Sequence, residues 1–223
     1  MPAGPRLSSV NSVTRLDLRE AWQLSSDALA RAITRLAPWV HHASNPFADW
    51  YYGDAETARD VITEWMGRAS SELHIGRALL LKGDDEDEPP LGCLIGMAGE
   101  ALAECRAADF LAFCEELGGG AEADEVIGEV LPVARQLFPP VAPDAFYISR
   151  VVIDPARRGA GLGRALVEKT LERRRTKGFR RFRLDVSADN EAALRTYRAL
   201  GFEVMETSES AAHGLRYLAM ETR

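Results

Sequence analysis

The sequence has few of the residues that metal sites and disulfide frameworks require. Its three cysteines, Cys93, Cys105 and Cys114, are odd in number and lack CxxC spacing, and its four histidines are scattered. This pattern predicts reduced thiols in a cytoplasmic protein and no bound metal. The longest uncharged apolar stretch, residues 91–99, is too short to span a bilayer, and the first 20 residues lack the apolar segment of a secretory signal. We therefore expect a cytoplasmic location and no membrane partner.

Acidic and basic residues are unevenly distributed along the chain. Residues 1–140 contain 11 Lys and Arg against 23 Asp and Glu, whereas residues 141–223 contain 16 against 11. The basic second half suits an anionic cofactor. The acidic first half either favours a cationic substrate or only increases solubility. The acidic balance of the whole chain, −7, argues against nucleic acid as a partner.

Residues 146–178 contain the most informative pattern. An apolar run ends at Asp154-Pro155, a basic turn rich in glycine follows at residues 157–163, and helical spacing starts without a gap. The first N–H groups of a helix have no partner within it, and glycines let a phosphate approach them. The pattern predicts a strand, turn and helix that bind a pyrophosphate. A plain glycine turn is the alternative.

The glycine spacing distinguishes between nucleotide-binding motifs. The chain lacks the Gly-Lys-Ser or Gly-Lys-Thr of a P-loop. A dinucleotide fingerprint needs a third glycine at position 164 or 166, where the chain has Arg164 and Leu166, although Asp185 follows at the distance of a ribose-binding acid. The spacing that fits is Arg158-x-x-Gly161-x-Gly163. It resembles the acetyl-CoA signature of the GCN5-related N-acetyltransferase (GNAT) superfamily.

A second motif of the same superfamily follows at the expected distance. The family pattern N-x-x-A-x-x-x-Y-x-x-x-G-F is matched by Asn190, Ala193, Tyr197, Gly201 and Phe202. The resemblance covers residues 145–223 well and the N-terminal half only in outline.

The resemblance implies a fold and a cofactor. The expected fold is α/β (α+β), with a mixed, mostly antiparallel central sheet splayed at its middle strands and flanked by helices. The whole chain, 1–223, would form one GNAT domain, with a loose tail at 1–10 and an acetyl-CoA-binding core at 145–204. The residues expected to bind acetyl-CoA are Val151, Val152, Ile153, Arg158, Gly159, Ala160, Gly161, Leu162, Gly163, Arg164, Asn190 and Tyr197.

The resemblance also implies roles in catalysis. Tyr197 stands where the family has a general acid beside the sulfur, or its ring only packs against the cofactor. Asn190 holds the cofactor or only caps its helix. Ser149 should face the cleft and is a candidate for binding the acceptor, but serine is a poor base. Glu100 is the nearest acidic candidate for a general base, unless it is an exposed loop carboxylate or the amine arrives already neutral.

The N-terminal half has the order of elements that opens this fold, and its aromatic connection would border the acceptor pocket. Trp50, Tyr51 and Tyr52 are therefore candidates for binding the acceptor, with core packing as the alternative. The expected elements are a strand at 12–18, helices at 20–36 and 55–69, the aromatic connection at 38–53, and a hairpin of 73–82 and 91–98 around an acidic loop at 84–88.

Residues 100–143 depart from the family pattern. Two helical stretches, 101–117 and 123–138, are separated by three glycines, and the second is interrupted by Pro132. We expect an inserted helical pair that covers the acceptor cleft or forms a homodimer contact, because its apolar faces need a partner.

Three functions follow from these observations. The first is an acetyl-CoA-dependent N-acetyltransferase that transfers an acetyl group to a primary amine of a small molecule or peptide by direct attack in a ternary complex. The second is a non-catalytic acyl-CoA-binding sensor or interaction module, suggested by the missing base and by the insertion. The third is a dinucleotide-dependent oxidoreductase.

Overall fold

The computed structural model describes residues 17–82 and 88–223, and in this part of the chain seven strands form one sheet in the order β1-β2-β3-β4-β5-β7-β6. Every neighbouring pair is antiparallel except β4 and β5, which are parallel. The strands are β1 (Leu18–Glu20), β2 (Ala78–Leu81), β3 (Gly92–Ala98), β4 (Ala145–Ile153), β5 (Arg181–Ser187), β6 (Glu203–Ser210) and β7 (Leu215–Thr222). The expected mixed, mostly antiparallel sheet is confirmed.

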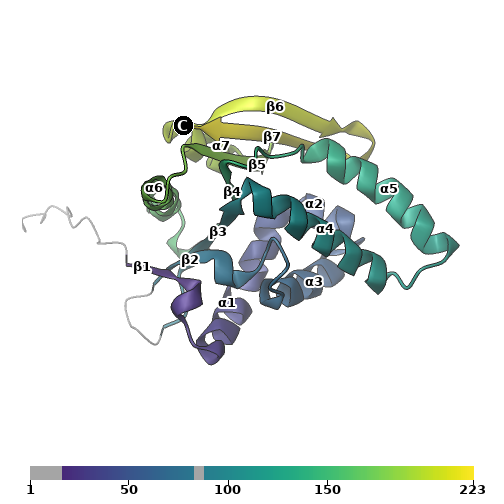
Figure 1. The fold of residues 1–223 in the computed structure, drawn as a ribbon, viewed down its shortest axis with the longest axis horizontal. Coiled ribbons are helices and arrows are strands. Elements are labelled where there is room, and N and C mark those ends of the chain that lie inside the picture. The colour runs from purple at the N-terminus through teal and green to yellow at the C-terminus, as the bar shows by residue number, and fades with distance from the viewer. Residues whose placement is uncertain (1–16, 83–87) are drawn as a thin grey trace, which may run out of the picture.

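Helices cover both faces of this sheet (Figure 1). In the figure α6 lies on one side of the sheet, whereas α1, α3, α4 and α5 lie on the other. The helices are α1 (Ser26–Ser44), α2 (Phe47–Tyr51), α3 (Ala55–Gly67), α4 (Gly99–Glu116), α5 (Ala121–Leu137), α6 (Leu162–Thr176) and α7 (Glu191–Ala199).

Alternation along the central strands divides the core into two layers. Leu80 and Val152 pack in the cluster under α1 and α3, whereas Leu79 and Ile153 pack in the cluster under α6 and α7. Side chains of successive strand residues point to opposite faces, so these apolar runs are buried on both sides. The sheet therefore separates the α6 and α7 layer from the layer that contains the other helices.

The first long helix differs from the sequence expectation. α1 begins at Ser26, where Ser25 accepts a hydrogen bond from the N–H of Ala28 (3.3 Å), and it continues through Pro38 to Ser44. The predicted range of 20–36 was therefore wrong at both ends. A proline inside a helix removes one hydrogen bond. Here the apolar face includes Ala37 just before the proline and continues beyond it with Val40, both buried, and this packing outweighs the loss.

Other boundaries also need correction. The aromatic connection contains the short helix α2, and residues 75–77 form a single 3₁₀ turn before β2 rather than part of the strand. The two inserted helices are present as α4 and α5, but α5 is continuous through Pro132. The N-terminal tail 1–10, residues 12–16 of the expected first strand, and residues 84–87 of the acidic loop lie outside the described residues.

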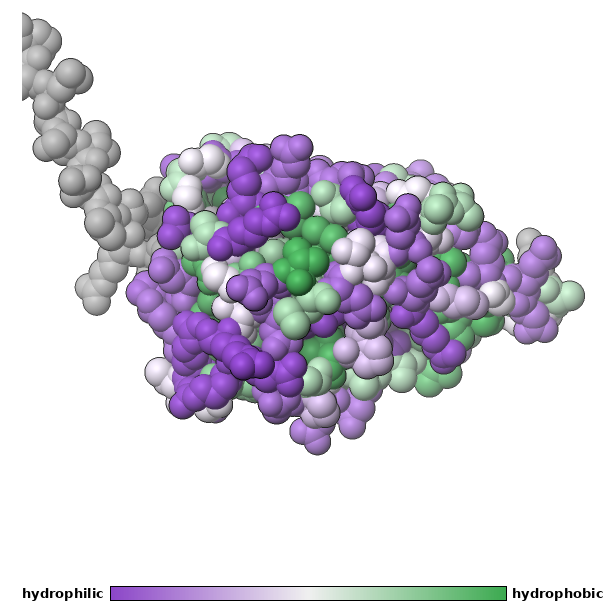
Figure 2. Space-filling view, turned by 90° about the horizontal axis from the view of Figure 1, so that it is seen from above, coloured by the Kyte–Doolittle hydropathy of each residue, from purple (hydrophilic) through white to green (hydrophobic). Residues whose placement is uncertain are grey.

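β6 and β7 form a hairpin at the edge of the sheet. The molecular face seen from above in Figure 1, where β6 lies, is mainly hydrophilic with small hydrophobic spots (Figure 2). Val204 and Met205 on β6 are among the exposed apolar side chains. The homodimer stays a prediction. No helix in the part of the chain described here has the length and apolarity of a membrane span.

Candidate active site

The sheet opens between β4 and β5. β4 pairs with β5 only from Ala145 to Ile148, although it continues to pair with β3 as far as Ile153. A bulge lies at this point, because Ile95 and Gly96 of β3 pair with Arg150 and Ile148 and leave Ser149 as the extra residue. One edge of β4 beyond Ser149 is therefore not paired with β5. This edge contains residues 151–153, which the family resemblance implies as part of the acetyl-CoA site.

The glycine turn leads directly from β4 into α6. Gly159 and Gly161 have φ angles of +82° and +78°, which only glycine adopts readily, and a Cβ at either would meet no atom within 4 Å. Gly161 precedes α6, and no side chain caps this helix. The N–H groups of Leu162, Gly163 and Arg164 therefore have no partner within the helix. The exposed turn fits a pyrophosphate.

α7 places the residues of the second motif. Asn190 accepts a hydrogen bond from the N–H of Ala193 (3.1 Å) and therefore caps the helix, which is one of the two roles expected for it. The Tyr197 ring packs against Phe202, with ring centroids 5.7 Å apart. Burial raises the pKa of Tyr197 to about 12, so its hydroxyl remains protonated at neutral pH.

A cavity of about 550 Å³ lies on the opposite face of the sheet from α6 and α7. Its floor comes from β4, β5 and β7, and its walls come from the C-terminal end of α1, from α2, α3, α4 and α5, and from the loop that contains Glu72 and Leu73. The residues that line it are Ala43, Ser44, Phe47, Ala48, Tyr51, Tyr52, Ile62, Trp65, Glu72, Leu73, Arg106, Ala107, Asp109, Phe110, Leu111, Leu131, Ala134, Arg135, Phe138, Tyr147, Ser149, Arg150, Asp185 and Tyr217.

Polar groups at the floor form a continuous network. The Glu72 carboxylate accepts hydrogen bonds from Ser149 Oγ (3.1 Å) and from Arg106 Nε (3.1 Å). Arg106 also donates to the Tyr147 hydroxyl (3.0 Å), which lies 3.1 Å from the Asp185 carboxylate. The network therefore joins β4, β5 and the inserted helix α4 beside the point where the sheet opens.

The charges around Glu72 hold it in the ionised form. Burial alone would raise the pKa of Glu72, but Arg106 and Arg150 outweigh burial and lower it below its ordinary value. Burial raises the pKa of Tyr147 well above the ordinary value of tyrosine, and the neighbouring Asp185 raises it further. The site thus contains an ionised carboxylate next to a hydroxyl, Ser149, at the open edge of β4.

Asp109 is a second carboxylate on the cavity wall. Its Oδ2 accepts hydrogen bonds from Ser71 Oγ (3.1 Å) and from the N–H of Glu72 (2.9 Å), whereas its buried Oδ1 has no hydrogen-bond partner among the described residues. Burial raises the pKa of Asp109 to about 6. Ionised Asp109 is therefore unfavourable for the folded protein.

This leads to a stability prediction for Asp109→Asn. Since the pKa is about 6 in the folded protein and about 4 in the unfolded chain, the folded state binds this proton more tightly. Stability from this group falls as the pH rises from about 4 to about 6. The variant should raise the free energy of unfolding by about 1–2 kcal/mol at pH 7.5 and change it little at pH 4. Urea denaturation at both pH values measures this, with the exposed Asp60→Asn as control. Destabilisation at pH 7.5 would contradict it.

The structure brings some of the predicted acceptor residues together. Tyr51, Tyr52 and Ser149 line the cavity, but Trp50 does not. The Trp50 ring instead packs beside His213, with centroids 4.8 Å apart. Glu100 is exposed in the first turn of α4 and is not among the lining residues, so its catalytic role stays a prediction without geometric support.

Sequence reasoning missed most of the polar floor. Glu72 lies in a loop and follows no motif, and Arg106 lies in the insertion, for which the family pattern gives no guide. Tyr147 could have been found, because it stands two residues before Ser149 on the same strand and so shares its face. Asp185, noted for its spacing as a ribose-binding acid, lines the cavity instead of lying at α6.

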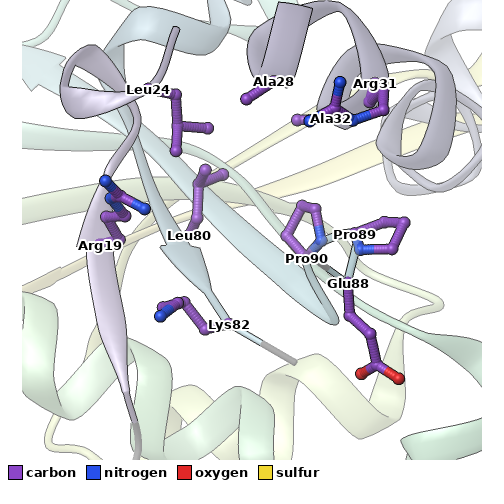
Figure 3. A pocket seen from close by; sticks show the side chains of 10 residues that line it. All are labelled: Arg19, Leu24, Ala28, Arg31, Ala32, Leu80, Lys82, Glu88, Pro89 and Pro90. Carbon is purple, nitrogen blue, oxygen red and sulfur yellow. The ribbon is translucent and has the colours of Figure 1, made fainter. Parts of the chain in front are cut away.

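A second hollow lies elsewhere, between β1, β2 and α1 (Figure 3). It measures about 60 Å³ and shares no lining residue with the large cavity. Arg19, Arg31, Leu80 and Pro90 are among the side chains around it. Its volume is too small for a substrate, so it is not a second candidate for the active site.

Known proteins resemble this chain in sequence and fold. L-2,4-diaminobutyric acid acetyltransferase of Nocardia farcinica is 29% identical over 91 residues, 41% of this chain and 47% of that protein, so the chain spans about half the length of this relative. Glucosamine 6-phosphate N-acetyltransferase of Trypanosoma brucei brucei is 30% identical over 142 residues, 62% of this chain and 89% of that protein.

A solved structure and a family model both relate this chain to acetyltransferases. The crystal structure of an N-acetyltransferase from Staphylococcus aureus Mu50 has a TM-score of 0.65 at 20% identity and covers 92% of this chain and 100% of that one, a likeness of fold. A model of the acetyltransferase (GNAT) family matches residues 40–202. With the open edge of β4 and the glycine turn before α6, this match means that the chain belongs to the GNAT acetyltransferase family.

Proposed function

We propose that this protein is an N-acetyltransferase that uses acetyl-CoA and acetylates a primary amine bound in the large cavity. The observation that carries the proposal is the unpaired edge of β4, which extends from Ile153, next to the glycine turn, to Ser149 on the cavity floor. An extended ligand that pairs with this edge would connect the helix N-terminus to the cavity. The names of the two relatives, which are acetyltransferases of amines, agree with this proposal.

The residues of the β4 edge and of the turn would hold acetyl-CoA. The backbone of Val151, Val152 and Ile153 offers hydrogen bonds along the open edge. The N–H groups of residues 162–164 and the side chain of Arg158 would bind the pyrophosphate. Bound acetyl-CoA supplies the thioester that the amine attacks.

Side chains at the cavity floor would remove the amine proton. Ser149 Oγ accepts the proton from the amine and passes its own proton to Glu72, 3.1 Å away. Glu72 is ionised at neutral pH because Arg106 and Arg150 lower its pKa against the effect of burial. Tyr197, protonated because burial raises its pKa to about 12, donates a proton to the departing sulfur.

Calorimetric titration of the protein with acetyl-CoA tests the cofactor assignment, with NADH as the control. We expect a dissociation constant in the micromolar range, roughly −8 kcal/mol, for acetyl-CoA and no heat of binding for NADH. An amine screen that detects the released thiol then tests turnover. Absence of acetyl-CoA binding would refute the function. Binding without turnover of any amine would favour the non-catalytic sensor.

A further inference from the structure

We infer that the acceptor is a primary amine with a bulky apolar body, with an arylalkylamine such as tryptamine or phenethylamine as its type. This inference rests on the proposed function and names its substrate class. It follows from three properties of the cavity: where its polar groups lie, what its cationic side chains already bind, and which segments form its walls.

Most polar groups of the cavity gather on one side, whereas Asp109 and Arg135 lie on the wall helices α4 and α5. Tyr147, Ser149 and Asp185 come from the sheet, and Glu72 and Arg106 join them in one network. The walls opposite are mainly aromatic and aliphatic. Among the wall residues are Tyr51, Tyr52, Trp65, Phe110, Leu131 and Phe138. An acceptor whose amine meets the polar floor therefore has its remaining atoms against apolar walls.

The aromatic wall residues support one another and leave a defined space. Phe47 packs edge-on against Phe138 at 4.8 Å between ring centroids, and Tyr51 packs against Phe113 at 4.6 Å. Tyr52 meets Trp65 edge-on at 5.7 Å. Rings held in this way form a preformed surface, and aromatic ligands gain from edge and offset contacts with it. A volume of about 550 Å³ is in the range of pockets for small organic ligands.

The cationic side chains of the cavity do not provide an anion site inside it. Arg106 is engaged by Glu72 and Tyr147. Arg150 donates to Ser44 Oγ (2.7 Å) and to the backbone oxygen of Ser149 (2.8 Å), and it pairs with Glu72. Arg135 is exposed on α5. At the polar floor an acceptor's phosphate or carboxylate would therefore meet only Arg106 and Arg150, which are already engaged, whereas Arg135 lines the cavity at its exposed side. Burial of an unpaired charge at the floor is costly.

The inserted helices form much of the apolar wall. Phe110 and Leu111 come from α4, and Leu131, Ala134 and Phe138 come from α5 and its C-terminal end. These residues lie in the segment that departs from the family pattern. The acceptor class is therefore set by the insertion, and it differs from the polar acceptors named for the two relatives.

An amine panel at pH 8 tests the inference through the rate of thiol release from acetyl-CoA. Tryptamine and phenethylamine should have kcat/KM values at least about 30-fold higher than 2,4-diaminobutyrate and glucosamine 6-phosphate, since one buried aromatic ring supplies a preference of this size. A higher kcat/KM for either polar amine, or for a peptide N-terminus, would overturn the inference and leave the proposed function intact. Failure to bind acetyl-CoA would instead remove both.

A cavity-filling variant locates the acceptor. Ala107 is exposed on α4 and lines the cavity, and Ala103, one turn earlier on the same helix, is also exposed but does not line it. Ala107→Phe should weaken tryptamine binding to the CoA-saturated protein about tenfold in calorimetry, with acetyl-CoA affinity unchanged. Ala103→Phe is the matched control and should change neither. Equal effects of the two variants, or none, would overturn the placement of the acceptor.

Discussion

Replacing Glu72 by glutamine is expected to lower kcat of acetyl transfer by a factor of about 100 to 1000 and to leave acetyl-CoA binding intact. Glutamine keeps the size of the side chain but cannot take the proton that Ser149 passes on. Among the described contacts of Ser149, only the hydrogen bond from its Oγ to Glu72 involves a carboxylate. The substitution therefore removes the proton acceptor of the relay. Steady-state rates and calorimetric acetyl-CoA affinity of the variant measure the two quantities separately.

The design has to separate chemistry from folding, because Glu72 also pairs with two arginines. Loss of one partner of a buried ion pair destabilises a protein by about 3–5 kcal/mol. Ser149→Ala removes the relay hydroxyl and keeps both ion pairs, so it should reduce kcat without this loss of stability. Glu64→Gln, at an exposed carboxylate that pairs with Arg68, is the control for charge. Full activity of a folded Ser149→Ala protein would contradict the relay.

The pH profile of the rate checks the ionisation state of Glu72 independently. The pKa of Glu72 is lowered, so this carboxylate stays ionised above its ordinary value of about 4.5 and is protonated only as the pH falls below it. Its contribution to stability is present above that value and is lost on acidification. Between pH 5 and pH 8 the protonation of Glu72 should therefore not change the rate of the wild-type protein. Any change of rate with pH in this range must come from the amine or from another group.

The turn before α6 could be predicted because its requirements are local. The positive φ angles of Gly159 and Gly161 and the start of the helix at Leu162 are all encoded within a few neighbouring residues. The helix that begins after Asn190 is local in the same way, since a short polar side chain accepts from the N–H three residues later.

The polar floor could not be predicted because its members meet only through tertiary packing. Glu72 contacts Ser149 at a sequence separation of 77 residues, and Tyr147 contacts Asp185 at a separation of 38. Neither pair has a periodicity or spacing that the sequence displays. Glu100 is a candidate base because it is the nearest acidic residue in sequence, but the structure exposes it in the first turn of α4.

The aromatic segment shows how a local boundary error hides a wall of the site. The sequence predicts a helix at 20–36 and an aromatic connection at 38–53, but α1 continues through Pro38 with Val40 buried, and the chain then forms the short helix α2. In this helix Tyr51 and the following Tyr52 reach the cavity, whereas Trp50 packs in the cluster with Phe138. Three consecutive aromatics cannot share one face of a helix, so only part of the set was correct.

Tyr197→Phe is expected to lower kcat by a factor of about 100 and to change the dissociation constant of acetyl-CoA by less than about twofold. The phenylalanine ring keeps the contact with Phe202, so only the hydroxyl is removed. A pKa raised to about 12 by burial keeps that hydroxyl protonated across the usual assay range, which suits a general acid and excludes tyrosinate as a base there.

The alternative role of Tyr197, packing of its ring alone, predicts the opposite division of effects. Tyr197→Phe would then be silent, and only Tyr197→Leu, which removes the ring, would weaken acetyl-CoA binding. The pair of variants therefore separates acid catalysis from packing by comparing kcat with the calorimetric dissociation constant. Since Tyr197 is on the α6 and α7 side of the sheet and Glu72 lines the cavity on the other side, loss of kcat in both single variants would support proton transfers on opposite sides of the opening between β4 and β5.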